Sequence, residues 1–356
     1  MSSGNPNKVI QIEGRTISND SPAFIVAEAA CNHLCDMKNG FAMIDEVVRA
    51  GADAIKFQTY VAEKLTTKSA GSYGNIQTKS QMDYYKQFDK FGRSEYDELF
   101  EYAREKGIIG FSTPFDPNNA QMLNSVHVPL FKIASCDLLY ADLLREVACF
   151  KKPVIISTGG ATLEEIMKSL EILSKAGADD IVLLACTLSY PTRAEDANYR
   201  KIVGLKKHFP DCLVGVSDHV EPEEHMISGA ICVSLGASVL EKHFTLDRKM
   251  GGGSSLAMEP ADLAKYVRNI RLTEKLLGSS ELKVHSVEEP NRIKARRSLV
   301  ANFDLKAGTV LSKEMIGVKR PGTGILPNQV EKFVGKVLKV DLPEDTQLDW
   351  FHIGEA

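Results

Sequence analysis

The sequence has no long apolar run and no strong excess of charge of one sign. No stretch approaches the roughly 20 consecutive apolar residues that span a bilayer, and the opening MSSGNPNKVIQIEGR shows no charged segment followed by an apolar one. Lysine and arginine number 43 against 47 aspartates and glutamates, a net charge of −4, which gives no basic field for nucleic acid or anionic membranes. These absences predict a cytoplasmic protein whose partners are neither membranes nor nucleic acids.

Cysteine is sparse, and its spacing shows no metal-binding pairs. The chain has 7 cysteines, an odd number, scattered through strand-like and helix-like runs. Such usage is typical of reduced thiols in a cytosolic protein. Cys31 and Cys35 are separated by three residues and no second pair accompanies them, so we expect no closed zinc site there.

What is present is a regular alternation of short β-branched runs and amphipathic helical patterns. Apolar residues recur at i, i+3, i+4 and i+7 in four clear helical segments, 40–52, 95–107, 162–177 and 260–278. Eight runs are expected to be strands: 24–30, 54–59, 108–115, 130–135, 153–159, 181–187, 213–219 and 239–245. This alternation predicts a (β/α)8 TIM barrel over residues 1–278, an α/β fold, with a hairpin at 8–17 capping its bottom.

The pattern changes after Gly278. Residues 279–297 are charged and poor in large apolar side chains, which indicates a linker. Beyond it, short alternating runs at 298–303 and 334–340 are broken by glycine and proline. We therefore predict a separate small β-rich domain over residues 298–356.

Polar side chains gather where the predicted barrel strands end, which is where such barrels build their active sites. The ends offer Glu28, Lys56 with Gln58, Ser112 with Thr113, Lys132 with Ser135, Ser157 with Thr158, Thr187, Ser217 with His219, and Lys242 with His243. A serine at such an end often only caps the next helix, and a lysine is usually solvated. Lys56 and Lys132 lie within apolar runs, where an unpaired ammonium is costly to desolvate and a bound anion would offset the cost. We therefore expect a cradle for phosphate and carboxylate.

Two histidines stand at the ends of neighbouring predicted strands, in 213-LVGVSDHVEP-222 and 239-VLEKHFTLDR-248. Either one alone would be read as a core residue bonded to a backbone carbonyl. Together, His219 and His243 can hold one divalent ion and leave positions open for water and substrate. Two nitrogen ligands suit Mn²⁺ or a similar labile ion better than a closed structural zinc site.

These motifs resemble the sialic acid synthase family, whose members condense phosphoenolpyruvate with N-acetylmannosamine or a related amino sugar. The resemblance covers nearly the whole chain and includes the family's small C-terminal antifreeze-like (SAF) domain. It rests on nine strings in the family's order: 27-AEAACNH-33, 51-GADAIKFQT-59, 112-STPFD-116, 131-FKIAS-135, 157-STGG-160, 186-CTLSYPT-192, 217-SDH-219, 242-KHFTLDR-248 and 319-KRPGTGI-325.

The resemblance implies a role for each matching residue. His219 and His243 would bind the metal, Mn²⁺ or else Mg²⁺ or Co²⁺, and the metal would polarise the sugar aldehyde. Glu28 and Asp137 would be the catalytic carboxyls, with Glu28 nearest the reacting carbons. The phosphoenolpyruvate site would comprise Lys56, Thr113, Lys132, Ser135, Ser157 and Ser217, and the amino sugar would meet Gln58, Asn75, Tyr190 and Arg320.

The implied chemistry begins with attack of C3 of the enol on the activated aldehyde. Water then adds to the oxocarbenium at C2, where a carboxylate must orient it or take its proton, and phosphate departs by C–O cleavage. The resemblance also implies a domain-swapped homodimer in which Arg320 binds the sugar held by the partner subunit.

The chain departs from the family pattern at three places: 32-NHLCD-36, 134-ASCD-137 and 250-MGGGSSLAMEP-260. The last replaces a loop that lies near the sugar in the family. N-acetylmannosamine is the first expectation, with precursors of legionaminic or pseudaminic acid as alternatives. Two other classes stay open: a metal-independent Schiff-base aldolase with Lys132 as nucleophile, and an inert barrel carrying an ice- or carbohydrate-binding module.

Overall fold

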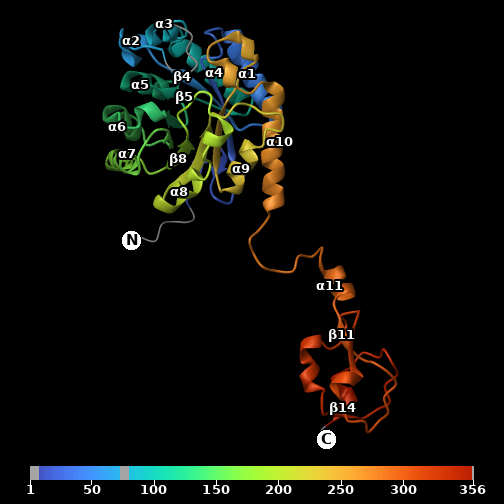
Figure 1. The fold of residues 1–356 in the computed structure, drawn as a ribbon. Coiled ribbons are helices and arrows are strands. Elements are labelled where there is room, and N and C mark those ends of the chain that lie inside the picture. The colour runs from blue at the N-terminus through green and yellow to red at the C-terminus, as the bar shows by residue number, and fades with distance from the viewer. Residues whose placement is uncertain (1–7, 73–79, 355–356) are drawn as a thin grey trace. The chain divides into compact units, whose positions relative to one another are not determined.

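The computed structural model describes residues 8–72 and 80–354 (Figure 1). The chain divides into two units, Met1–Gly278 and Ser279–Ala356, and each is described by itself.

Eight parallel strands form the centre of the first unit. In sheet order they run β5, β4, β3, β10, β9, β8, β7, β6, and every hydrogen-bonded pair is parallel. β5 and β6 lie next to each other, which closes the sheet into a barrel. The strand bounds are β3 Phe24–Ala30, β4 Ala54–Thr59, β5 Ile109–Pro114, β6 Phe131–Ile133, β7 Val154–Ser157, β8 Ile181–Cys186, β9 Leu213–Asp218 and β10 Val239–His243. The predicted (β/α)8 barrel is confirmed.

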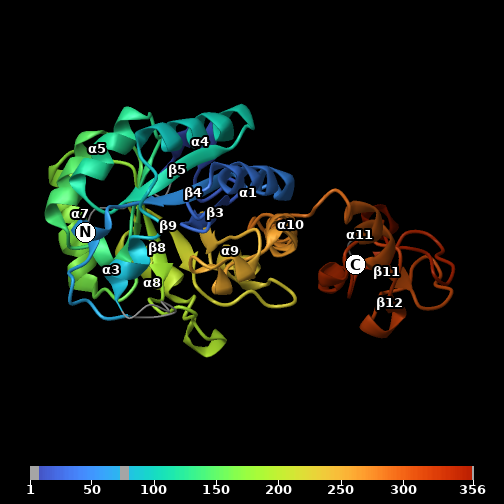
Figure 2. The same cartoon turned by 90° about the horizontal axis from the view of Figure 1, so that it is seen from above.

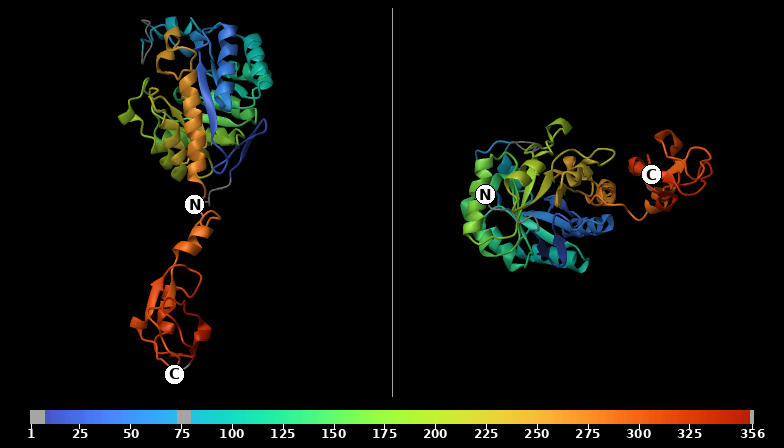
Figure 3. Two further views of the ribbon diagram at one scale, coloured as in Figure 1. Left: turned by 90° about the vertical axis from the view of Figure 1, so that its right-hand side faces the viewer. Right: turned by 90° about the horizontal axis from the view of Figure 1, so that it is seen from below.

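Helices surround the strands (Figures 2 and 3). Several begin where a side chain accepts a bond from the first turn: Asp36 from the Lys38 N–H and Asp116 from the Asn119 N–H. The helices of this unit are α1 Met37–Ala50, α2 Ala62–Leu65, α3 Gln81–Tyr85, α4 Arg93–Glu105, α5 Pro117–Ser125, α6 Ala141–Cys149, α7 Leu163–Lys175, α8 Lys201–His208, α9 Ser228–Ser234 and α10 Pro260–Leu277. In the part of the chain that is described, no helix is both long and apolar enough to cross a membrane.

A hairpin lies at the N-terminal ends of the strands, as predicted. β1 (Ile10–Ile12) pairs antiparallel with β2 (Arg15–Ile17), and its isoleucines are buried in the barrel core. Lys8 forms an ion pair of 2.8 Å with Asp180, which directly precedes β8. The hairpin therefore closes the bottom of the barrel and leaves the opposite end for the site.

Several predicted strands end earlier in the structure. One of them is β6, which was expected over 130–135 and covers only Phe131–Ile133. Residues Ser135–Asp137 form a 3-10 turn instead, in which the Asp137 N–H donates to the Ala134 carbonyl. Further 3-10 turns cover Ala194–Asp196, Arg248–Met250, Ser254–Leu256, Lys313–Met315, Pro327–Lys332 and Trp350–His352.

The second unit is small and β-rich. β11 (Ser298–Ala301) pairs antiparallel with β12 (Ile316–Lys319), and β13 (Val337–Leu338) with β14 (Ile353–Gly354), around a separate apolar core. The segment 279–297, predicted to be a linker, contains the short helix α11 (Glu289–Ala295). Pro290 in the first turn and basic residues in the last favour this helix. The N–H of Gly322 donates to the Ile293 carbonyl at 2.8 Å, which attaches α11 to the second unit.

Candidate active site

Lys56 of β4 lies at the centre of a buried polar cluster inside the barrel. Its Nζ is 2.7 Å from Glu28 Oε2 of β3 and donates to Thr113 Oγ1 of β5 at 2.9 Å. Gln58 Nε2 donates to Glu28 Oε1 at 2.9 Å. Glu28 and Lys56 are each 2% exposed, so their ion pair is shielded from solvent. The barrel thus brings together these four predicted site residues from three adjacent strands.

Lys132 of β6, the strand next to β5, faces the same space. Its Nζ donates to Ser157 Oγ of β7 at 2.7 Å. Glu241 of β10 connects the two lysines, because its Oε1 is 3.7 Å from the Nζ of both Lys132 and Lys56. The same oxygen accepts a hydrogen bond of 3.1 Å from Ser217 Oγ of β9. The cluster therefore extends round the barrel as one network of ions and hydroxyls.

Glu241 was not among the predicted site residues. With Glu28 it compensates the charges of both buried ammonium groups within the chain itself. A signal for Glu241 was present in the sequence: it lies two residues before His243 on the same strand, and alternate residues of a strand face the same side.

The two carboxyls of the cluster differ in acidity. Burial raises the pKa of Glu28 to about 7, although Lys56 acts against the shift. Burial also opposes the charge on Glu241, but attraction to Lys132 and Lys56 outweighs it and holds the pKa of Glu241 below its ordinary value. Glu28 is thus the carboxyl that can gain or lose a proton near neutral pH, as a catalytic acid or base must.

His219 and His243 lie side by side at the carboxyl ends of β9 and β10, with ring centroids 5.4 Å apart. The Nδ1 of His219 is 2.9 Å from the Thr187 carbonyl oxygen. Because a carbonyl only accepts, Nδ1 carries the proton and the lone pair of Nε2 is left to bind a ligand. Burial lowers the pKa of both histidines, that of His243 strongly, so both rings are neutral at neutral pH.

These two imidazoles fit a labile divalent ion. A metal-binding histidine typically donates its other N–H to a carbonyl or carboxylate, as His219 does. Across residues 8–72 and 80–354 no group of three or more histidine, cysteine, aspartate or glutamate side chains is arranged to hold a metal. The chain would therefore supply two nitrogen ligands and leave the remaining positions to water and substrate.

Tyr190 and Ser135 also border this space. The ring centroid of Tyr190 lies 4.2 Å from that of His219 and 6.2 Å from that of His243. Ser135 Oγ accepts a hydrogen bond of 2.9 Å from the N–H of Gly159. A Cβ at Gly159 would lie only 2.8 Å from this Oγ, so the close approach of the two loops requires glycine there.

Asp137 stands at the end of the 3-10 turn after β6 and is partly buried. Its Oδ2 lies 3.6 Å from Cys136 Sγ, and burial raises its pKa to about 6. Of the other predicted residues, Asn75 lies outside the described part of the chain. Arg320 is exposed in the second unit, directly after β12.

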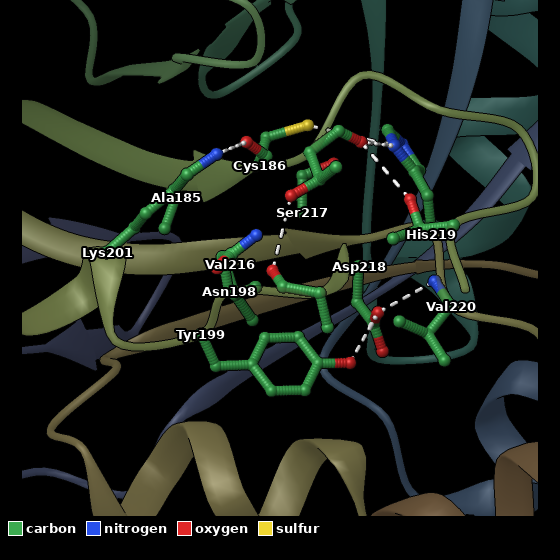
Figure 4. Close-up of a pocket in the computed structure, with 13 residues that line it drawn as sticks. Ala185, Cys186, Asn198, Tyr199, Lys201, Val216, Ser217, Asp218, His219 and Val220 are labelled. Atoms are coloured by element: carbon green, nitrogen blue, oxygen red, sulfur yellow. Dashed lines mark hydrogen bonds between the residues drawn. The ribbon is translucent and has the colours of Figure 1, made fainter. Parts of the chain in front are cut away.

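A second buried ion pair lies on the outer side of the same strand ends. Lys242 Nζ is 2.8 Å from Asp218 Oδ2, and Asp218 Oδ1 accepts from the Tyr199 hydroxyl at 2.9 Å and from the Val220 N–H at 3.0 Å. Asp218, Tyr199, Val220 and His219 also line the small pocket shown in Figure 4. Sequence reasoning named Lys242 as a polar residue at a strand end but not this pairing.

Two known sequence families match parts of this chain. The NeuB family matches residues 43–282, and the SAF domain matches residues 296–353. The chain belongs to the NeuB family. It is accordingly an enzyme of the sialic acid synthase type, as the motifs indicated.

Relatives of this NeuB-family chain are similar over almost their whole length. An uncharacterized protein of Methanocaldococcus jannaschii is 40% identical over 344 residues, which is 96% of this chain and 97% of the relative. The N,N'-diacetyllegionaminic acid synthase of Legionella pneumophila is 35% identical over 339 residues, 93% of this chain and 94% of the relative. The crystal structure of N-acetylneuraminic acid synthetase from Leptospira borgpetersenii, in complex with citrate, has a TM-score of 0.73 at 34% identity and covers 80% of this chain and 95% of the other.

In this NeuB-family chain the turn after β3 and the loop around Gly252 lie against each other. In the turn after β3, Cys31 Sγ lies 3.3 Å from the Gly252 carbonyl oxygen. A Cβ at Gly252 would lie 2.9 Å from Leu34 Cδ2, so this loop packs closely on the turn. The backbone of Leu34 and Cys35 has positive φ, 55° and 54°, a conformation that few non-glycine residues adopt. The turn and the loop therefore form one surface patch beside the ends of β3 and β10.

Proposed function

We propose that this NeuB-family enzyme condenses phosphoenolpyruvate with an N-acetylated amino sugar to give a nonulosonic acid and phosphate. The observation that carries the proposal is the buried cluster in which the Nζ atoms of Lys56 and Lys132 meet the hydroxyls of Thr113 and Ser157. Ammonium and hydroxyl groups are the donors that phosphate and carboxylate groups accept. Both anionic groups of phosphoenolpyruvate can therefore be bound within one cluster.

The carboxylates of the cluster stabilise the buried lysines in the free enzyme. Two buried ammonium groups without compensation would carry a large desolvation penalty. Glu28 and Glu241 offset that penalty, because Glu28 pairs with Lys56 and one oxygen of Glu241 lies 3.7 Å from the Nζ of both lysines. An entering anion then competes with these carboxylates for the lysines. Protonation of Glu28 near neutral pH relieves the repulsion between this carboxylate and the anion.

A divalent ion, Mn²⁺ in the first place and otherwise Mg²⁺ or Co²⁺, would be held by His219 and His243. When bound, it supplies Lewis-acid polarisation of the sugar carbonyl. The chain's own part is to keep both imidazoles neutral through burial and to fix the tautomer of His219 through the Thr187 carbonyl.

Glu28 is the proposed proton carrier. Its Oε1 is oriented by Gln58 and its Oε2 by Lys56, so both oxygens have defined positions. With a pKa of about 7 it can take a proton from the water that adds at C2 and release it again at neutral pH. Asp137, whose pKa burial raises to about 6, is the second carboxyl proposed to act.

The acceptor sugar is proposed to be N-acetylmannosamine, with a 2,4-diacetamido-6-deoxy sugar of the legionaminic or pseudaminic series as the alternative. The similarity to an N,N'-diacetyllegionaminic acid synthase supports the alternative. The loop 250–260, which replaces a loop that lies near the sugar in the family, contacts Cys31 and Leu34 through Gly252.

The enzyme is further proposed to act in the cytoplasm as a domain-swapped homodimer. Arg320 directly follows Lys319, which pairs with Ser298 of β11, so its backbone is held at the end of a strand pair. An exposed guanidinium on such a support can donate several hydrogen bonds to a sugar. In the dimer this sugar would be held by the partner barrel.

The test is release of phosphate from phosphoenolpyruvate by the full-length protein, with a panel of N-acetylated hexosamines and mass analysis of the product. We expect release only with a divalent ion, Mn²⁺ in the first place, and a matching sugar, and loss of activity with EDTA. Full activity in EDTA, together with trapping of pyruvate on Lys132 by borohydride, would instead establish a Schiff-base aldolase.

A further inference from the structure

We propose that the buried pair of Asp218 and Lys242 is a positioning device for the divalent ion, because it fixes the spacing of the two histidines that would bind it. This inference rests on the proposed metal site. Neither residue of the pair has been given a role in binding substrate or metal above.

The pair connects β9 and β10, the two strands that carry the histidines. The connection lies one residue before each histidine. Asp218 and Lys242 are partners in the β9–β10 register, and each directly precedes its histidine in the chain. Side chains of successive strand residues point to opposite faces. The histidines can therefore face the barrel interior while the ion pair lies behind them, on the side of the helices.

Most polar bonds of this pair end on groups near His219, and Asp218 also accepts a hydrogen bond from the Ser228 hydroxyl of α9. Lys242 Nζ donates to Asp218 Oδ2 and to the carbonyl of Val220, the residue after His219. The N–H of Val220 donates to Asp218 Oδ1, which closes a loop of bonds around the His219 backbone. The hydroxyl of Tyr199 completes the set from the segment before α8. His219 is thus held on its backbone side by the pair and on its ring by Thr187.

Burial makes stability alone a poor explanation for this pair. The side chains of Lys242 and Asp218 are 2% and 1% exposed. For a pair this deeply buried, the desolvation penalty can equal or exceed the Coulombic gain, and well-packed apolar residues are often as stable. Apolar residues cannot form directional hydrogen bonds. In this pair such bonds fix the distance between the ends of β9 and β10.

The test measures Mn²⁺ affinity of the full-length protein without substrates, by electron paramagnetic resonance of the unbound ion. Residues that orient the metal ligands without binding the metal typically raise the affinity for the metal by about 10- to 100-fold. We expect Lys242→Met to weaken Mn²⁺ binding by about that factor, and excess Mn²⁺ to restore its turnover because the pair touches no substrate. A folded Lys242→Met protein whose dissociation constant stays within about twofold of wild type overturns the inference.

Tyr199→Phe decides the question if Lys242→Met does not fold, because it removes one bond to Asp218 and leaves both charges in place. We expect weaker Mn²⁺ binding than wild type, by a smaller factor than for the lysine variant. Unchanged affinity would then overturn the inference.

Arg271→Met is the matched control. Arg271 forms an ion pair of 2.8 Å with Asp53 in the same barrel, next to the start of β4 and far along the strands from the histidines. This variant should lose stability and keep wild-type Mn²⁺ affinity. Equal weakening in the control would mean general loosening of the barrel and would overturn the positioning role.

The histidine variants separate this inference from the metal site itself. If wild type binds no Mn²⁺, or if His219→Ala and His243→Ala bind as wild type does, the proposed metal site is wrong and the inference is overturned with it. If binding depends on both histidines and Lys242→Met still matches wild type, only the inference is wrong.

Discussion

Replacement of Lys132 by methionine removes one buried ammonium group and keeps a side chain of similar length. In the structure Lys132 Nζ donates to Ser157 Oγ at 2.7 Å and is 3.7 Å from Glu241 Oε1. The methionine side chain would leave the shape of the barrel interior almost unchanged while removing one of the two charges proposed to bind phosphoenolpyruvate. Lys56 would then be the one lysine left beside Glu28 and Glu241 in this cluster.

The expected loss follows from one hydrogen bond between a charged donor and a charged acceptor. Such bonds contribute about 1.5 to 3 kcal/mol, which corresponds to a rise in KM for phosphoenolpyruvate of about 10- to 150-fold. KM for the amino sugar should change by less than about threefold, because the proposed sugar contacts do not include this residue. The free energy of unfolding should also fall, because the Glu241 carboxylate loses one of the two ammonium groups that balance its charge. Adding Glu241→Gln should recover the free energy of unfolding but not phosphoenolpyruvate binding.

The assay is steady-state phosphate release with each substrate varied in turn. Lys152→Met is the control, because Lys152 stands just before β7, at the opposite end of the barrel, and donates to the Val128 carbonyl at 2.7 Å. The control should leave both KM values unchanged. A rise in KM confined to the sugar, or an equal rise for both substrates, would refute the assignment of Lys132 to the phosphoenolpyruvate site.

Three further predictions concern the metal, the proton carrier and the second unit. His219→Ala or His243→Ala should abolish Mn²⁺-dependent turnover with an unchanged circular dichroism spectrum; wild-type turnover by either variant contradicts the metal assignment. The pKa of Glu28 rises from 4.5 in the unfolded chain to about 7 in the folded protein. Between these pH values the unfolded chain loses its proton first. Glu28 therefore lowers the free energy of unfolding by up to about 3 kcal/mol as pH rises from 4.5 to about 7. Glu28→Gln should lack this decline in urea titrations at pH 5 and pH 8; an unchanged pH slope would show that its pKa is not raised. Arg320→Ala should weaken sugar use alone, and mixing it with inactive His219→Ala chains should restore activity; no recovery despite proven subunit exchange would exclude the role in trans.

Periodicity predicted the barrel well because each strand is buried on both faces and each helix carries one apolar stripe. It failed where a local turn competed with a strand, as at Ser135–Asp137, where a 3-10 turn ends β6 early. It also missed α11, whose seven residues bury no side chain, so no apolar stripe marks it.

Candidate site residues could be predicted from the sequence where a single residue is unusual for its position. Lysines inside apolar runs and histidines at strand ends stand out in a sequence, and the structure brings Lys56, Lys132, His219 and His243 to one end of the barrel. Pairings across strands depend on register, which the sequence does not display. For that reason the contacts of Glu241 with Lys56 and Lys132 were not predicted.

The central proposal is that phosphate leaves phosphoenolpyruvate by C–O cleavage only when an amino sugar has been attacked. The most direct measurement uses phosphoenolpyruvate labelled with ¹⁸O at the oxygen that bridges C2 and phosphorus, with the full-length enzyme, Mn²⁺ and the sugar panel. We predict that released phosphate carries the label, and that none is released without a sugar. Unlabelled phosphate, or release that does not depend on any sugar, would contradict the proposed reaction.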